Sequence, residues 1–158
     1  MEASVMKIFF IILSCIVIAV IIWFFIQGAA SKQGKALGLI ENNLASCPDK
    51  PNCVCSEHKD DTQHYISPIT LTQNTSSALL NLKKVIDEIG GTVQTESDGY
   101  LAATFTSALF GFVDDLEIKI DARQHLIHLR SASRVGHSDM GINKKRVELL
   151  KQLYKERS

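Results

Sequence analysis

One segment of the sequence, LRSASRVGHSDMGINKKR at residues 129–146, is rich in arginine, serine and lysine and also holds His137, Asp139 and Asn143. Guanidinium groups such as those of Arg130 and Arg134 bind carboxylates and phosphates through paired hydrogen bonds. We expect the segment to run from a strand end, through a loop at Gly136, into a helix start, where backbone N–H groups also favour anions. These features indicate a site for an anionic or polar ligand. The candidate ligand-binding residues are Arg130, Ser131, Ser133, Arg134, Asp139 and Asn143, with Asp114 and Asp115 added from the strand expected beside them.

The same residue types could instead form a buried ion-pair network that holds the last helix on the sheet. In that interpretation Asp114 or Asp115 pairs with Arg130 or Arg134. Asp139 then caps the helix, because a short acidic side chain accepts hydrogen bonds from the first helical amides. The sequence leaves the binding site and the structural network both open.

Catalytic patterns are not completed in this sequence. Ser131 or Ser133 with His137 and Asp139 supplies the residue types of a catalytic triad, but they lie too close in the chain to face one another. The sequence contains no G-x-S-x-G, H-E-x-x-H, P-loop or dinucleotide-binding pattern. We expect a protein without enzymatic activity, metal or cofactor. The enzymatic alternative is a hydrolase-like protein that uses a divalent metal at Asp114, Asp115, His137 and Asp139.

Three cysteines, Cys47, Cys53 and Cys55, are followed closely by His58. Three interpretations are open: a disulfide from Cys47 to Cys53 or Cys55, a zinc site with three thiolates and one imidazole, or three free thiols. A disulfide would place the domain in an oxidising compartment outside the cytoplasm.

A long apolar run precedes these polar segments. Residues 8–26 read IFFIILSCIVIAVIIWFFI and carry no charge. At 1.5 Å per residue, a helix of this length spans about 28 Å, close to the hydrocarbon thickness of a bilayer. Trp23 lies near one end, where interfacial aromatic residues are common. We predict a transmembrane helix at 8–26 after a short tail at 1–7. A cleaved signal peptide and a lipoprotein site at Cys15 are the alternatives, but the run is longer than a signal peptide requires.

Hydrophobic periodicity organises the rest of the chain. Residues 27–46 suit a linker and 47–158 a globular domain. Within the domain, alternation predicts strands and a 3.6-residue period predicts helices. The result is an α+β domain of order β-α-β-β-β-β-α, with an antiparallel sheet covered on one face by two helices, as in TATA-binding-protein-like, helix-grip folds. The expected strands are 65–71, 92–96, 100–106, 112–121 and 126–133. The first helix is expected to follow cap residues at 74–77, to place Leu79, Leu82, Ile86 and Ile89 on one face, and to end at residues 90–91. The second helix is expected at 140–155.

The charge distribution argues against nucleic-acid binding. The chain has 17 basic and 17 acidic residues and a net charge of zero. Its basic residues are not interleaved with aromatic ones, as they are in many nucleic-acid-binding surfaces.

Three segments, CPDKPNCVCS, VDDLEIKI and RSASRVGHSDMGINKKRVELL, resemble the DUF1499 family, and the resemblance covers about residues 40–156. The family's S-A-S-R-x-G and D-x-G-x-N elements match residues 131–136 and 139–143. The first two family cysteines match Cys47 and Cys53, which implies that these two pair. The position of Cys55 is commonly serine in the family, which implies that this thiol is free.

Members of this family resemble bacterial and plastid proteins, often with an N-terminal hydrophobic segment. The resemblance brings no settled activity, cofactor or substrate. We therefore expect a single-pass protein of the bacterial inner (plasma) membrane, part of the cell envelope, with its domain on the periplasmic side. Its expected role is a non-enzymatic accessory or binding domain. Its expected partners are the lipid bilayer and an unknown ligand or envelope protein. A purely structural envelope protein is a further alternative.

Overall fold

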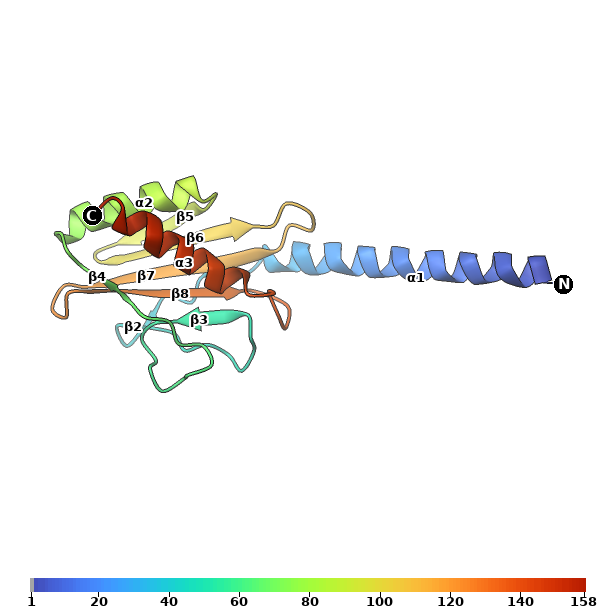
Figure 1. The fold of residues 1–158 in the computed structure, drawn as a ribbon, viewed down its shortest axis with the longest axis horizontal. Coiled ribbons are helices and arrows are strands. Elements are labelled where there is room, and N and C mark those ends of the chain that lie inside the picture. Colours follow the sequence, from blue (N-terminus) through green and yellow to red (C-terminus); the bar gives the residue numbers. More distant parts are fainter. Residues whose placement is uncertain (1) are drawn as a thin grey trace.

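A long helix and a small α+β domain make up the protein. The computed structural model describes residues 2–158. Its first helix, α1 (Glu2–Ser31), has 30 residues. Figure 1 shows α1 projecting from one end of the domain, while the C-terminus lies at the opposite end. The window of α1 that is most apolar is not buried against the domain, and the helix is long and apolar enough to cross a membrane.

The domain is built on a six-stranded antiparallel sheet whose strands differ in length. Strands β5 (Thr92–Ser97), β6 (Tyr100–Thr106), β7 (Val113–Asp121) and β8 (Leu126–Ser133) are consecutive neighbours. Short connections favour this arrangement, because antiparallel strands can be joined by tight turns. The predicted meander of four strands is therefore confirmed. Outside it, β3 (Cys53–Cys55) and β4 (Ile69–Thr70) both pair with β8.

Helix α2 (Thr75–Glu88) begins at a polar cap. The side chain of Asn74 accepts a hydrogen bond from the Ser77 amide at 2.9 Å, which satisfies one of the free N–H groups at the helix start. After the helix, Gly90 has a φ of +83°, a conformation that ends helices and favours glycine. One face of α2 is buried, through Ala78, Leu82, Val85 and Ile86.

Helix α3 (Ile142–Lys155) begins two residues later than the predicted helix at 140–155. Met140 and Gly141 have φ values of +56° and +77°, so neither can continue a right-handed helix. The Asp139 carboxylate accepts hydrogen bonds from the amides of Gly141 (3.0 Å) and Asn143 (2.6 Å). Gly141, not Asp139, is the N-cap residue of α3, but the Asp139 carboxylate two positions earlier accepts the hydrogen bond of a first-turn amide, which is the interaction expected of it. The buried side chains of α3 are Asn143, Val147, Leu150 and Tyr154.

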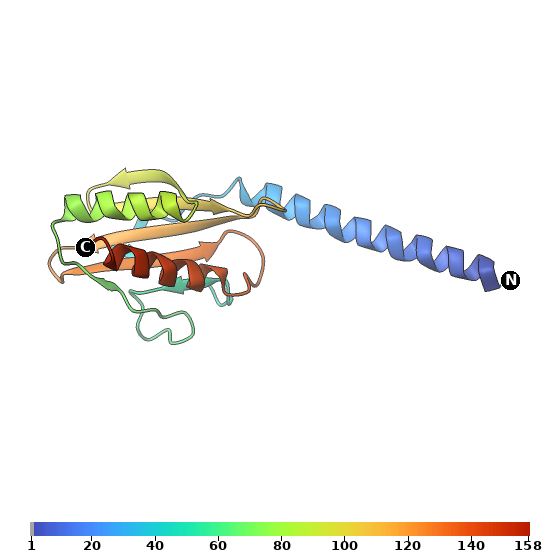
Figure 2. The ribbon, with the colours of Figure 1, turned by 45° about the horizontal axis from the view of Figure 1, so that its top comes forward.

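Both helices cover the same face of the sheet, and Figure 2 shows them side by side on it. Alternate residues of β6, β7 and β8 point toward them and form the main hydrophobic core. The predicted α+β class, with two helices on an antiparallel sheet, is confirmed. The strand residues in this core include Leu101, Ala103, Phe105, Leu116, Ile118, Ile127 and Leu129.

The opposite face of the sheet is also covered, although the sequence alternation suggests one apolar side only. The segment 32–58 folds over it and contains the short hairpin of β1 (Leu39–Ile40) and β2 (Asn43–Leu44). Residues 27–46, expected to be a linker, therefore end α1 and then pack against the sheet. As a result, charged residues of β7 that face away from the helices are buried, among them Asp115, Glu117 and Lys119.

Two predicted strand boundaries need correction. The strand expected at 65–71 is reduced to β4, because Pro68 has no N–H to donate to a neighbouring strand. The cysteine segment, where no strand was predicted, contains β3, which is buried beside β8. A strand of three residues between polar segments is too short to be recognised from the sequence.

Candidate functional site

The first polar cluster lies on the sheet face that the segment 32–58 covers, and its centre is Glu117 of β7. The sheet register places Arg130 of β8 directly opposite Glu117, and an Arg130 Nη to Glu117 Oε2 ion pair of 2.9 Å joins them. The Glu117 side chain has no exposed surface. Its Oε1 also accepts hydrogen bonds from the Tyr100 hydroxyl (2.8 Å) and from the Gly38 amide (2.8 Å). Glu117 therefore joins three strands to the covering segment.

Tyr100 is held as a neutral donor in this cluster. Burial, together with the adjacent Glu117 carboxylate, raises the pKa of Tyr100 well above its ordinary value. The phenol consequently keeps its proton and donates a hydrogen bond to Glu117. Arg130 is less well satisfied, because its buried Nε has no hydrogen-bond partner within residues 2–158.

Arg134, just beyond the end of β8, lies on the same sheet face. Its guanidinium pairs with Asp115 through two parallel contacts, Nε to Oδ2 at 2.8 Å and Nη to Oδ1 at 2.7 Å. The hydrogen bonds that Arg134 donates to the Asp115 carboxylate raise the pKa of Arg134. A third contact, of 3.2 Å, goes to the carbonyl oxygen of Ser31, the last residue of α1. Arg134 therefore links the end of α1 to the sheet.

A third ion pair on this face joins Lys119 to Glu57 at 2.5 Å, and Asn43 accepts a further hydrogen bond from Lys119. The Glu57 carboxylate also accepts a hydrogen bond from the Leu44 amide. His128 lies beside this pair. Burial lowers the pKa of His128, with the charge of Lys119 acting in the same direction and the carboxylates of Glu57 and Asp121 opposing it.

The second polar cluster lies on the helix-covered face, with Asn143 of α3 at its centre. The Asn143 side chain accepts a hydrogen bond from the Ser131 hydroxyl (2.5 Å) and donates to the Ser133 hydroxyl (3.0 Å) and the Asn52 carbonyl (3.1 Å). Arg146, one turn further along α3, donates to both Ser131 and Asn143. Asn143 is almost fully buried, so the cluster fixes the start of α3 on β8.

Arg146 is the cation of this second cluster. It pairs with Asp114 at 2.8 Å, and its guanidinium lies 4.4 Å above the Phe105 ring, a cation–π distance. Sequence reasoning included Arg146 in the polar segment but gave it no role. A helix residue three positions after Asn143 shares its face, and this spacing is the signal that could have found it.

The candidate ligand-binding residues are therefore divided between two faces of the sheet. Successive strand residues point to opposite faces, so Arg130 and Ser131 cannot line one pocket. Arg130, Arg134 and Asp115 lie under the covering segment, whereas Ser131, Ser133, Asp114, Asn143 and Asp139 lie at the start of α3. The predicted single pocket around both arginines and Asn143 gives way to two ion-paired clusters. Sequence reasoning missed Glu117, Tyr100, Glu57 and Lys119.

The residues of the hydrolase alternative do not converge either. Asp114 and Asp115 point to opposite faces of β7 and each has its own arginine. His137 is exposed in the loop before α3. Within residues 2–158, no group of three or more His, Cys, Asp or Glu side chains is arranged to hold a metal ion.

Comparison with known families adds one finding to this geometry. The family model described as "Protein of unknown function (DUF1499)" matches residues 43–153. The chain belongs to the DUF1499 family. The matched range begins at β2 and ends within α3, so it includes the whole six-stranded sheet and every side chain of the two polar clusters, while the backbone contacts from Gly38 and Ser31 lie outside it. Among curated proteins, none matches the chain.

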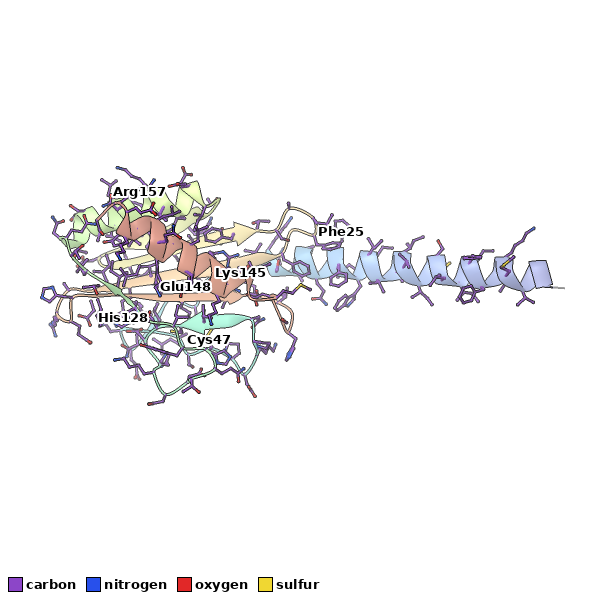
Figure 3. All side chains as sticks on the ribbon, in the orientation of Figure 1. Phe25, Cys47, His128, Lys145, Glu148 and Arg157 are labelled. Carbon is purple, nitrogen blue, oxygen red and sulfur yellow. A yellow bond between two sulfur atoms is a disulfide. The ribbon has the colours of Figure 1, made fainter. Side chains whose placement is uncertain are left out.

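The cysteines of the DUF1499 domain divide into a pair and a single thiol. Cys47 and Cys53 form a disulfide, which Figure 3 marks at the edge of the domain near β3. Cys55 is a free, buried thiol, and burial raises its pKa. A buried protonated thiol is a poor nucleophile. Cys55 therefore fits the role of a small core residue beside Leu44 and Tyr100.

A cavity of about 510 Å³ opens where the DUF1499 domain meets the residues that follow α1. One wall is the segment 32–38, and the other is the outer surface of β5 and β6. Three basic residues, Lys32, Lys35 and Arg134, belong to its lining, and the described lining contains no acidic residue. Lys32 and Lys35 are exposed and form no ion pair within residues 2–158. Polar lining side chains are Gln94, Thr95, Tyr100, Thr104 and Thr106.

Proposed function

We propose that this chain is a single-pass protein of the bacterial inner membrane whose DUF1499 domain acts as a non-enzymatic accessory or binding domain of the cell envelope. The observation that carries the proposal is α1, which presents apolar side chains on all sides and buries none of its most apolar window in the domain. A helix that is apolar all round has its favourable environment in lipid.

The periplasmic orientation has one support in the domain itself. The Cys47–Cys53 disulfide is stable in an oxidising compartment, and such bonds are rare in the cytosol. The single helix with a short N-terminal tail is compatible with a domain outside the cytoplasm.

The non-enzymatic role is supported by the state of the buried charges. Glu117, Asp115 and Asp114 are each paired with an arginine, so none is a free acid or base. Buried ion pairs of this kind fix a conformation, and these three carboxylates are therefore not free to transfer a proton.

The cavity lined by Lys32, Lys35 and Arg134 supports an anionic ligand. Arg134 is neutralised by Asp115, but the two lysines contribute positive charge without a partner. Ammonium groups are strongly hydrated point charges that suit phosphate or carboxylate oxygens. The cavity thus takes the place of the predicted pocket and keeps its expected ligand class, sharing only Arg134 with it.

Membrane fractionation of the full chain tests the anchor. We expect the protein to stay in the membrane after an alkaline carbonate wash. A variant with Ile16→Lys and Val20→Lys should be released, because a lysine near the bilayer centre costs about 3 kcal/mol by insertion scales. Ile16→Leu with Val20→Leu is the matched control. Release of the unmodified chain by carbonate would contradict the anchor.

Fusions to the C-terminus test the orientation. Alkaline phosphatase folds only outside the cytoplasm, whereas green fluorescent protein exported in unfolded form stays dark. We expect an active phosphatase fusion and a dark fluorescent-protein fusion. The opposite pair of results would place the domain in the cytoplasm.

Titration with inorganic phosphate tests the ligand class. The purified full chain in detergent should bind phosphate, and Lys32→Gln with Lys35→Gln should weaken that binding by about tenfold or more, since hydrogen bonds to charged groups contribute about 1.5–3 kcal/mol. The matched control is Lys144→Gln with Lys145→Gln, an exposed lysine pair on α3. Equal affinity of the two variants would contradict an anion site in this cavity.

A further inference from the structure

The loop between β6 and β7, residues 107–112, is strongly apolar and lies against α1. Phe110 and Phe112 contact Phe24 of α1, with ring centroids 5.1 and 6.3 Å apart, and Phe110 also contacts Phe25 at 5.2 Å. At the tip of the loop, Leu109 is 70% exposed. In Figure 1 this loop extends from the domain alongside the C-terminal part of α1, and Figure 3 labels Phe25 at the same place.

The contact between loop and helix is close. A Cβ atom added to Gly28 would lie 1.8 Å from the carbonyl oxygen of Phe110, so only glycine permits this approach. One turn later, the Ser31 hydroxyl accepts a hydrogen bond of 3.0 Å from the Val113 amide. The loop is therefore held along the last two turns of α1 by both ring contacts and backbone contacts.

The length of α1 indicates how deep in a bilayer the contact between the loop and the helix would lie. Thirty residues at 1.5 Å each make a helix of about 45 Å, the thickness of a bilayer with its headgroup layers. Ser31 then lies at the outer edge of the headgroups, and Phe24 and Phe25 lie about 10 Å closer to the bilayer centre. A bilayer of about 45 Å with a hydrocarbon core of about 30 Å has headgroup layers of about 7 Å, so the two rings lie just inside the acyl chains, beside Trp23 and about 2–3 Å below the interface where aromatic rings concentrate.

We infer that the loop 107–112 enters the membrane interface beside α1, with Leu109 and Phe110 in contact with lipid. The domain then touches the bilayer at two places rather than through its anchor alone. Continuity with α1 favours lipid as the partner, because the exposed apolar surface of the loop joins that of the helix. Lys32 approaches the loop at Gly111, in a position that suits a lipid phosphate. The inference rests on the proposed membrane anchor.

Depth-dependent quenching of a thiol-linked NBD fluorophore tests this inference in the full chain, reconstituted in phosphatidylcholine–phosphatidylglycerol vesicles. The native Cys15, exposed on α1, reports the anchor. Leu109→Cys reports the loop, and Ala122→Cys, in the exposed turn after β7, is the matched control at the far end of the domain. Both of these variants carry Cys15→Ser. The Cys15→Ser chain alone should take up no label, because Cys55 is buried and the other cysteines are paired.

The expected pattern is strong quenching of the Leu109→Cys label by lipids with a nitroxide near the headgroup, and no quenching at Ala122→Cys. The Cys15 label should be quenched best by a nitroxide deep in the acyl chain. If Cys15 is quenched while Leu109→Cys behaves like Ala122→Cys, the loop contact is overturned and the anchor stands. If Cys15 is not quenched either, the anchor and the loop contact both fail.

Discussion

Truncation of Glu117 to alanine is expected to be among the most destabilising single changes in the domain. It would leave the Arg130 guanidinium, whose side chain is 5% exposed, without its carboxylate. Removing one partner of a buried ion pair costs about 3–5 kcal/mol. Tyr100 and Gly38 would lose their acceptor as well, which places the expected loss toward the upper end of that range. This is a large share of the 5–15 kcal/mol that stabilises a typical domain.

Urea unfolding of the full chain in detergent micelles measures this loss. The single tryptophan of the chain, Trp23, belongs to α1 and would report on the anchor, so the domain should be followed by far-ultraviolet circular dichroism. With an m-value of about 2 kcal/mol per molar urea, the midpoint should fall by about 2 M. A fall of less than 0.3 M, roughly 0.5 kcal/mol, would refute the reasoning.

A second variant separates the ion pair from general damage to the core. Replacing a buried ion pair by apolar residues of similar volume is often neutral, whereas removing one partner is not. Glu117→Leu combined with Arg130→Met should therefore be more stable than Glu117→Leu alone by about 2 kcal/mol. Strict additivity of the two single changes would show that the charges do not interact.

Three further predictions concern other parts of the domain. Asn143→Ala should lower the free energy of unfolding by about 2–3 kcal/mol, because it leaves the buried Ser131 hydroxyl without its acceptor and detaches the start of α3. An unchanged midpoint in urea unfolding would contradict this. Since the pKa of His128 is lowered in the folded state, its contribution to stability is present above its ordinary pKa of 6.5 and is lost as the pH falls below that value. His128→Gln should therefore reduce the dependence of the free energy of unfolding on pH below 6.5. The same pH dependence in the variant and the unmodified chain would argue against this role. Without reductant, iodoacetamide should leave Cys47 and Cys53 unmodified in an intact-mass measurement after unfolding, and loss of this short-loop disulfide should cost about 2 kcal/mol; full alkylation would contradict the pairing.

The sheet and the helices could be read from the sequence because their signals are local. The alternation of Leu116, Ile118 and Ile120 fixes one face of β7, and the cap at Asn74 fixes the start of α2. These patterns depend on residues near one another in the chain. Local agreement between pattern and structure is the reason that the order of these elements was predicted correctly.

The two polar clusters could be predicted only in part. The pairing of Asp115 with Arg134 belongs to the ion-pair network that the sequence suggests, but the other partners are far apart in sequence. Gly38 reaches Glu117 across 79 positions, and Asn52 reaches Asn143 across 91. The charged residues that alternate along β7, Asp115, Glu117 and Lys119, predict a solvent-exposed face, but the segment 32–58 covers that face in the structure. A short buried strand such as β3 gives no periodic signal, since three residues are too few to show one.

The joint between α1 and the sheet has a mechanical consequence. Ser31, the last residue of the helix, is bonded to the start of β7 through Val113 and to the end of β8 through Arg134. No flexible tether separates the helix from the domain at this point. Membrane helices change their tilt when the hydrocarbon thickness changes. With α1 as the proposed membrane anchor, such a tilt would turn the whole domain, so that its far end, where the C-terminus lies, would shift over the membrane surface as lipid composition varies.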